Sequence, residues 1–264
     1  MSTITLSTRN LVGLLGDLLL TAGSDPDMPA TMGVLLHTAD GEFVLDLPPD
    51  SDETPLIDAV ESDLLVGMST DTFAVGQAHV PCEFSVPIGW LRPAFVAVTD
   101  AKAVVSAFKP LASSLGRETT HRCELELTGD VLTVREDPNQ VPSGLVVKFH
   151  VGDGENFPSV VDRMQPDPTM PVAGKDHEVI EPSYGTGFNG KYVEALGKIS
   201  KRRKMPIAVY RHHQNRPVVV EIGSSYRAAV SPVALNEEEG QHLAPTVRVF
   251  APPQRERKSE SADA

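Results

Sequence analysis

The sequence has few cysteines, few aromatic residues and no long apolar run, and each shortage excludes a class of protein. Only two of its 264 residues are cysteine, Cys82 and Cys123, and no CxxC spacing indicates a zinc or redox motif. We expect both thiols to be buried as small apolar side chains in a reducing cytosol. The apolar runs fall well short of the roughly 18 residues that a membrane-spanning helix needs, so we expect no membrane association.

Signals for secretion and for catalysis are also absent. Residues 1–10 lack a basic segment leading into an apolar core, so we expect no signal peptide and a cytoplasmic protein. There is no GxSxG, P-loop or HExxH motif. His212 and His213 could suggest metal binding, but neighbouring residues of a strand point to opposite faces and do not readily chelate one ion. We therefore expect no enzymatic activity, cofactor or metal.

Positive charge is scarce as well. The formal net charge is −13, from 23 Lys and Arg against 36 Asp and Glu, which argues against a wholly basic nucleic-acid-binding protein. It does not exclude nucleic-acid binding, because the position of the positive charges decides that question.

Apolar residues at helical spacing predict three helices, each beginning near a capping residue. The first begins at Ser7 or Thr8, the second at Thr99 or Asp100 and the third after Asn189. Their expected inward faces carry Leu11, Leu15 and Leu18 with Leu14 and Leu19; Val104, Phe108 and Leu111; and Val193, Leu196 and Ile199. We expect Pro110 to kink or end the second helix.

Short strand-like segments follow each helix. They cover residues 31–37, 42–47, 64–69, 73–80, 82–86, 123–127, 131–135, 144–151, 205–210, 217–222 and 226–230. Turns are expected at residues 39–41 and at Gly129-Asp130. The order of one helix and then several strands occurs three times, which predicts an α+β fold of repeated modules with a helix packed on antiparallel strands.

Composition suggests four segments. We expect residues 1–158 to form a domain of two helix-plus-sheet modules, and the proline-rich residues 159–182 to form a connector. Residues 183–235 form the third module, and residues 236–264 a charged tail that is partly disordered.

Basic residues recur on the predicted helices. Lys191, Lys198 and Arg202 lie near one line of the third helix, which ends in the cluster Lys201, Arg202, Arg203 and Lys204. Lys102 and Lys109 share a face of the second helix, Arg117 lies just beyond it, and Arg9 is on the first. Such residues could contact phosphates without reading bases, although an ordinary solvated helix face has the same pattern.

Three stretches resemble the bacterial-type DNA sliding clamp, the beta subunit of DNA polymerase III, in a shortened form of the kind that phages carry. Residues 69–75, followed by Val80-Pro81, are similar to the Thr-Asp strand turn of its middle domain. Residues 151–158 resemble the Asp-Gly-x-Phe-Pro connector, and residues 187–196 with 226–233 resemble the last half-domain. The likeness extends over most of residues 1–235.

This resemblance implies a homo-oligomeric ring with helices inside and sheets outside, which encircles double-stranded DNA without sequence specificity. The resemblance also implies a processivity factor that would tether the replicative DNA polymerase. Polymerase and clamp loader would dock short peptides in an apolar pocket between two domains. Carried over by motif, the pocket includes Thr70, Asp71, Thr72, Phe73, Pro158, Val230, Ser231, Pro232 and Val233.

The sequence departs from the family at two places in this pocket. Phe73 follows Thr72 where the family has His-Arg, and Ser231 stands where Met is common. The number of subunits also stays open: a ring of twelve modules needs four chains of three modules, or three chains if residues 152–182 hide a fourth. A clamp-fold module that binds a polymerase or transcription partner without encircling DNA is the alternative hypothesis.

Overall fold

The computed structural model describes residues 2–43, 60–85, 90, 92–114, 121–140, 144–159, 188–210 and 217–232. The helices are α1 (Thr8–Leu18), α2 (Val98–Ser114) and α4 (Gly190–Arg203), with a short 3-10 helix at Pro29–Thr31. The strands are β1 (Ser2–Ser7), β2 (Gly33–Phe43), β3 (Val60–Thr70), β4 (Ala74–Phe84), β5 (Ala94–Ala97), β6 (Arg122–Thr128), β7 (Val131–Glu136), β8 (Val146–His150), β9 (Ile207–Tyr210), β10 (Val218–Ile222) and β11 (Tyr226–Val230).

The order of elements repeats along the chain. β1-α1-β2-β3-β4 forms module 1 and β5-α2-β6-β7-β8 forms module 2, each a strand, a helix and three strands. Module 3 is α4-β9-β10-β11, and no strand precedes its helix among the described residues. The helix-plus-sheet repetition and the α+β class expected from the sequence are therefore confirmed.

Modules 1 and 2 exchange their first strands. β1 pairs with β6 of module 2, and β5 pairs with β2 of module 1, both antiparallel. The sheet then runs β5-β2-β3-β4-β1-β6-β7-β8. Two hydrogen bonds between Phe95 and Gly152, 2.9 and 3.0 Å long, bring the far end of this path back to β5. The result is a nearly closed, barrel-like sheet.

Module 3 joins module 1 through a strand pair. β11 lies antiparallel to the first half of β4, where Val230 is opposite Ala74 and Tyr226 is opposite Ala78. The β9-β10-β11 sheet thereby extends the sheet of module 1, although about 140 residues of sequence separate β4 from β11.

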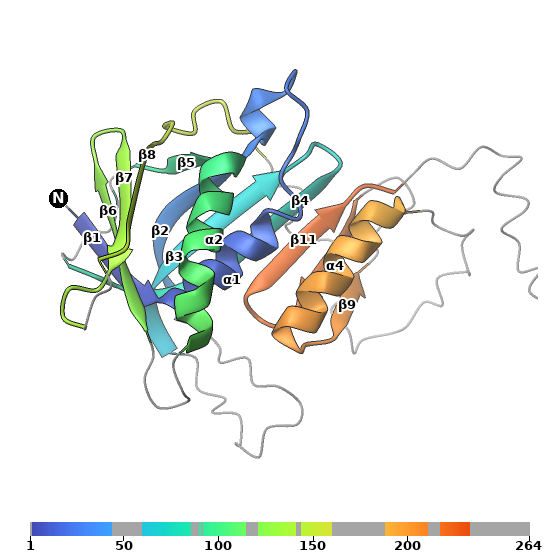
Figure 1. Ribbon diagram of the computed structural model, residues 1–264. Helices are drawn as coiled ribbons and strands as arrows, with labels where there is room; N and C mark the ends of the chain where they lie inside the picture. Colours follow the sequence, from blue (N-terminus) through green and yellow to red (C-terminus); the bar gives the residue numbers. More distant parts are fainter. Residues whose placement is uncertain are drawn as a thin grey trace, which may run out of the picture.

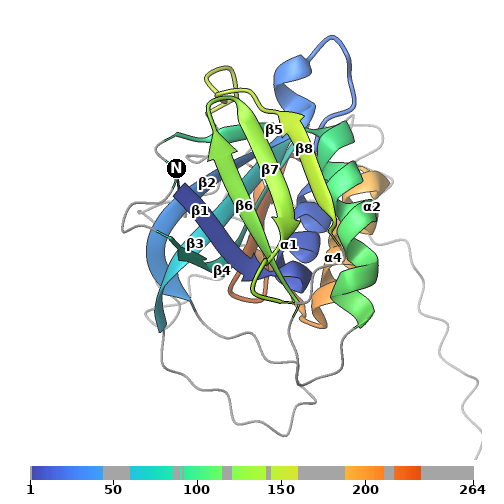
Figure 2. The same ribbon diagram turned by 60° about the vertical axis from the view of Figure 1, so that its left-hand side comes forward.

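The helices form one layer over the strands. α1, α2 and α4 lie on the same side of the sheets in both views (Figure 1 and Figure 2). The inward face of α1 buries Leu11, Leu14, Leu15 and Leu18, as expected. α1 approaches β3 closely at Gly67, where a Cβ atom would lie 2.3 Å from Leu18 Cδ1.

Two local strand expectations were wrong, and Pro110 does not end its helix. The turn at residues 39–41 is absent, because β2 runs straight through it and Asp40 pairs with Asp63 of β3. Residues 82–84 belong to β4 rather than to a separate strand. α2 continues through Pro110 to Ser114. In each case a long ladder or a packed helix face overrides a local turn or breaker signal.

The inward face of α4 was predicted correctly at Ile199 and wrongly at Val193, while Leu196, also predicted, is partly buried against the core. Val193 is 57% exposed, whereas Tyr192, Ala195 and Ile199 are buried. The capping prediction is confirmed, because the Asn189 side chain accepts a hydrogen bond of 2.9 Å from the backbone N–H of Lys191. Lys204 ends the helix in the left-handed conformation, with φ 55°.

Candidate nucleic-acid interface and partner pocket

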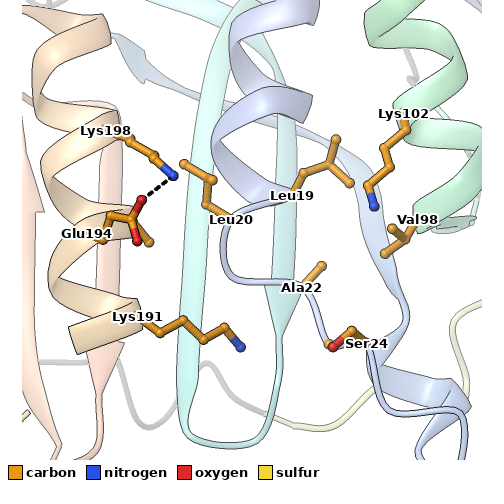
Figure 3. A pocket seen from close by; sticks show the side chains of 11 residues that line it. Leu19, Leu20, Ala22, Ser24, Val98, Lys102, Lys191, Glu194 and Lys198 are labelled. Atoms are coloured by element: carbon orange, nitrogen blue, oxygen red, sulfur yellow. Dashed lines mark ion pairs between the residues drawn. The ribbon is translucent and has the colours of Figure 1, made fainter. Parts of the chain in front are cut away.

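A hollow of about 270 Å³ lies between α2 and α4, at the end of α1. Its floor is the chain that leaves α1, from Leu19 to Ser24 (Figure 3). α2 contributes Val98 and Lys102, and α4 contributes Lys191, Glu194, Ala195 and Lys198. Three of the predicted DNA-binding residues, from two different helices, therefore surround one concave site.

The lysines of this hollow differ in their ion pairs. Lys198 pairs with Glu194 at 2.6 Å, and both side chains are more than half exposed. The hydrogen bond from Lys198 lowers the pKa of Glu194. Lys191 pairs with Asp71 at 2.8 Å, and its own side chain is 55% exposed. Lys102 is exposed on α2 and extends toward the hollow (Figure 3). The site is basic with one exposed carboxylate.

The other predicted DNA-binding residues are spread along the helix layer. Arg9, Lys109, Lys201 and Lys204 are exposed. Arg117 lies outside the described residues. Exposure alone does not test DNA binding, so the assignment of these residues stays a prediction.

Arg202 and Arg203 have a structural role. Both bind Asp17 of α1, whose side chain is 1% exposed, and the Arg203 Nε–Asp17 Oδ2 distance is 2.9 Å. Arg203 also donates to Ser225 Oγ at 2.6 Å and lies 5.5 Å from the ring centre of Tyr226. Burial raises the pKa of Asp17, and the two guanidinium groups oppose that shift. We call Asp17, Arg202 and Arg203 the module latch, because they connect modules 1 and 3.

The predicted partner pocket begins at the turn between β3 and β4. Thr70 is buried and its Oγ1 donates to the carbonyl of Ala74 at 2.9 Å. Thr72 has φ 77°, a conformation that is uncommon for a residue with a side chain. Asp71 Oδ1 accepts from the N–H groups of Phe73 and Ala74. The turn presents Phe73, which is 63% exposed.

β11 brings the end of module 3 to this turn. The Ser231 N–H donates to the Phe73 carbonyl at 2.8 Å, and Pro232 follows. Val230 is only 3% exposed and packs with Ala74 and Tyr192 beneath α4, so its side chain does not face solvent. Val233 lies outside the described residues.

The other face of the β4-β11 pair carries a separate apolar cluster. Val75 and Ala229 are buried there, and Phe157 packs against them. Pro158, the next residue, is half-buried. The residues that we predicted for the pocket are thus close together at the junction of modules 1 and 3, but they divide between two faces of the sheet.

Sequence reasoning missed Asp17, Tyr192 and Phe157 as parts of these sites. For Asp17, the available signal of burial was its place on the apolar stripe of α1, between Leu14 and Leu18. Tyr192 and Phe157 stood inside the motifs that were noticed, yet their partners lie far away in sequence.

The described residues lack the pattern of a metal site and that of a membrane-spanning helix. Within the described ranges, no three His, Cys, Asp or Glu side chains gather as metal ligands would. His212 and His213 lie outside these ranges. None of the described helices has the length and apolar character needed to span a bilayer.

The architecture is shared with solved bacterial clamps. The DNA polymerase III beta subunit of Thermotoga maritima superposes with a TM-score of 0.57 at 15% identity, covering 89% of this chain and 66% of that one. The C. crescentus beta sliding clamp gives 0.60 at 13% identity, with 88% and 65% covered. The Bacillus subtilis DNA polymerase sliding clamp gives 0.56 at 10% identity, with 89% and 64% covered.

These comparisons establish the fold. The chain has the sliding-clamp fold, as the sequence resemblance implied, and it spans about two thirds of the length of the clamps that it matches. No protein-family model matches the sequence, and the search of curated proteins returned no match.

Proposed function

We propose that this protein is a DNA sliding clamp, a non-catalytic processivity factor whose helix layer faces duplex DNA inside a homo-oligomeric ring. The observation that carries the proposal is the lysine-lined hollow between α1, α2 and α4, on the side of the molecule opposite the sheets. An acidic protein that places exposed lysines on two helices of one layer provides phosphate contacts that read no sequence.

Free strand edges support self-assembly. Among the described strands, β8 pairs only with β7 and β9 pairs only with β10, so each has one unpaired edge. Exposed apolar side chains accompany both edges, with Val146 on β8 and Val209 on β9 being 48% and 60% exposed. Unpaired edges of this kind are templates for pairing with another chain, and head-to-tail pairing generates a ring when the rotation closes.

The turn that carries Phe73 is the proposed docking point for short peptides of a polymerase and a clamp loader. Phe73 is presented on a turn fixed by side-chain hydrogen bonds, next to Ser231 and Pro232. A preorganised apolar anchor is suited to a short peptide, because little conformational freedom is lost on binding.

The salt dependence of DNA binding tests the proposed DNA face. Replacing Lys102, Lys191 and Lys198 by Ala should weaken binding to a random-sequence duplex and lower the slope of log affinity against log salt by about 2 to 3. Arg227→Ala, on strand β11, is the control, because it removes a positive charge from a sheet rather than from the helix layer. If the triple variant keeps the wild-type slope, the hollow does not face DNA.

A second function stays open because the chain spans only about two thirds of the clamps that it matches. A clamp-fold module that binds a polymerase or transcription partner without encircling DNA needs no ring. Light scattering separates the two, because that module would be a monomer or an open dimer.

A further inference from the structure

The Asp71 carboxylate connects the proposed peptide-docking turn to the proposed DNA face. Its Oδ1 accepts hydrogen bonds from the backbone N–H groups of Phe73 and Ala74, 3.2 and 2.9 Å long. Its Oδ2 accepts from Lys191 Nζ and from the Tyr192 hydroxyl, both at 2.8 Å. One carboxylate therefore holds the turn on one side and the beginning of α4 on the other.

Tyr192 and Lys191, the two hydrogen-bond donors on α4, differ in how freely their side chains can leave Asp71. Tyr192 is 7% exposed and packs with Ala74 and Val230. Burial, and then the hydrogen bond to Asp71, raise the pKa of Tyr192, so its hydroxyl keeps its proton and remains a donor. The Lys191 side chain is 55% exposed and also lines the hollow, whereas the Asp71 side chain is 9% exposed. Lys191 can leave Asp71 for solvent, and Tyr192 cannot.

We infer that a DNA phosphate and Asp71 compete for Lys191, so that DNA binding at the hollow loosens the Phe73 turn and changes the affinity of the peptide-docking site. This inference rests on the proposed function, because it assumes that the hollow receives DNA. Asp71 acts here as a positioning residue, since it acts on the docking site through the turn.

The competition follows from charge and geometry. When the Lys191 ammonium group contacts a DNA phosphate, it exchanges the Asp71 carboxylate for another anion. Asp71 then keeps the Tyr192 hydroxyl and the two backbone donors but loses its only cationic partner among the described residues. Linkage is reciprocal, so a peptide that stabilises the Asp71–Lys191 pair must weaken DNA binding by the same factor.

Hydrogen exchange at the turn tests the first half of the inference. The probe is a random-sequence duplex, and exchange is measured by mass spectrometry in peptides that cover residues 68–76. Saturating duplex should speed exchange of the Phe73 and Ala74 amides by about two- to fivefold, the factor expected from losing one partly exposed ion pair. Lys191→Met should abolish the change, and Lys198→Met should retain it, because Lys198 lines the same hollow but pairs with Glu194.

Duplex affinity tests the second half through a double-mutant cycle. Asp71→Asn should tighten duplex binding in the wild-type background, because it frees Lys191, and should have no effect in the Lys191→Met background. Tyr192→Phe is the control, since it weakens the same turn without releasing Lys191.

The outcomes separate this inference from the proposed function. The coupling would be overturned if duplex bound without changing hydrogen exchange at the turn. It would also be overturned if Asp71→Asn changed duplex affinity equally in both backgrounds. Either result would leave the clamp proposal intact. A failure of the protein to bind duplex at all would overturn both.

Discussion

Asp17 connects α1 of module 1 to α4 of module 3. It lies on the buried face of α1 and receives both Arg202 and Arg203 from α4. A buried carboxylate is costly to desolvate unless its partners surround it, so the latch functions only as a complete set.

We predict that Asp17→Ala lowers the free energy of unfolding by about 3 kcal/mol, because Arg203, with a side chain 15% exposed, is left without its carboxylate. Urea unfolding followed by circular dichroism measures the change. Glu194→Ala is the matched control, since it also removes the carboxylate of an ion pair, but an exposed one, and should have a much smaller effect. Equal losses in the two variants would show that the latch does not stabilise the fold.

At the scale of single residues, the sequence indicated the turn but not its connections. Thr70 to Phe73 were selected because residues 69–75 resemble the Thr-Asp strand turn of the clamp family. Asp71 and Lys191 are 120 positions apart, and no local pattern predicts that they meet. The same limit hid the module latch, because Asp17 and Arg203 become neighbours only after β4 and β11 pair.

At the scale of elements, helices were easier to predict than the strands before them. The leucine stripe of α1 has clear helical spacing, and four of its members are buried as expected. β1 and β5 were missed because each is short and runs directly into a helix, so no turn residue marks its end. β2 was divided in two because Asp40-Gly41 is a strong local turn signal, which the β2-β3 ladder overrides.

The two helix caps supply a test at this scale. Asn189 caps α4 with a side-chain hydrogen bond, whereas Ser7 at the start of α1 makes none. Asn189→Ala should therefore lower the free energy of unfolding by about 1 kcal/mol, and Ser7→Ala by less than about 0.5 kcal/mol. Chemical denaturation measures both values, and a larger loss for Ser7→Ala would contradict the assignment of the caps.

At the scale of the whole molecule, the sequence predicted the kind of module but not how modules join. The exchange of first strands between modules 1 and 2 and the β4-β11 pair are long-range contacts. They place α1, α2 and α4 in one layer (Figure 1), which is the surface that we propose to face DNA.

Topological trapping tests whether the protein encircles DNA. The protein is incubated with a linear duplex, the ends are ligated to make a circle, and the products are separated by gel filtration in salt high enough to remove surface-bound protein. We predict that the protein stays with the circle and is released when a restriction enzyme linearises it. Loss of protein from the circle before cutting, or retention that survives cutting, would contradict this prediction.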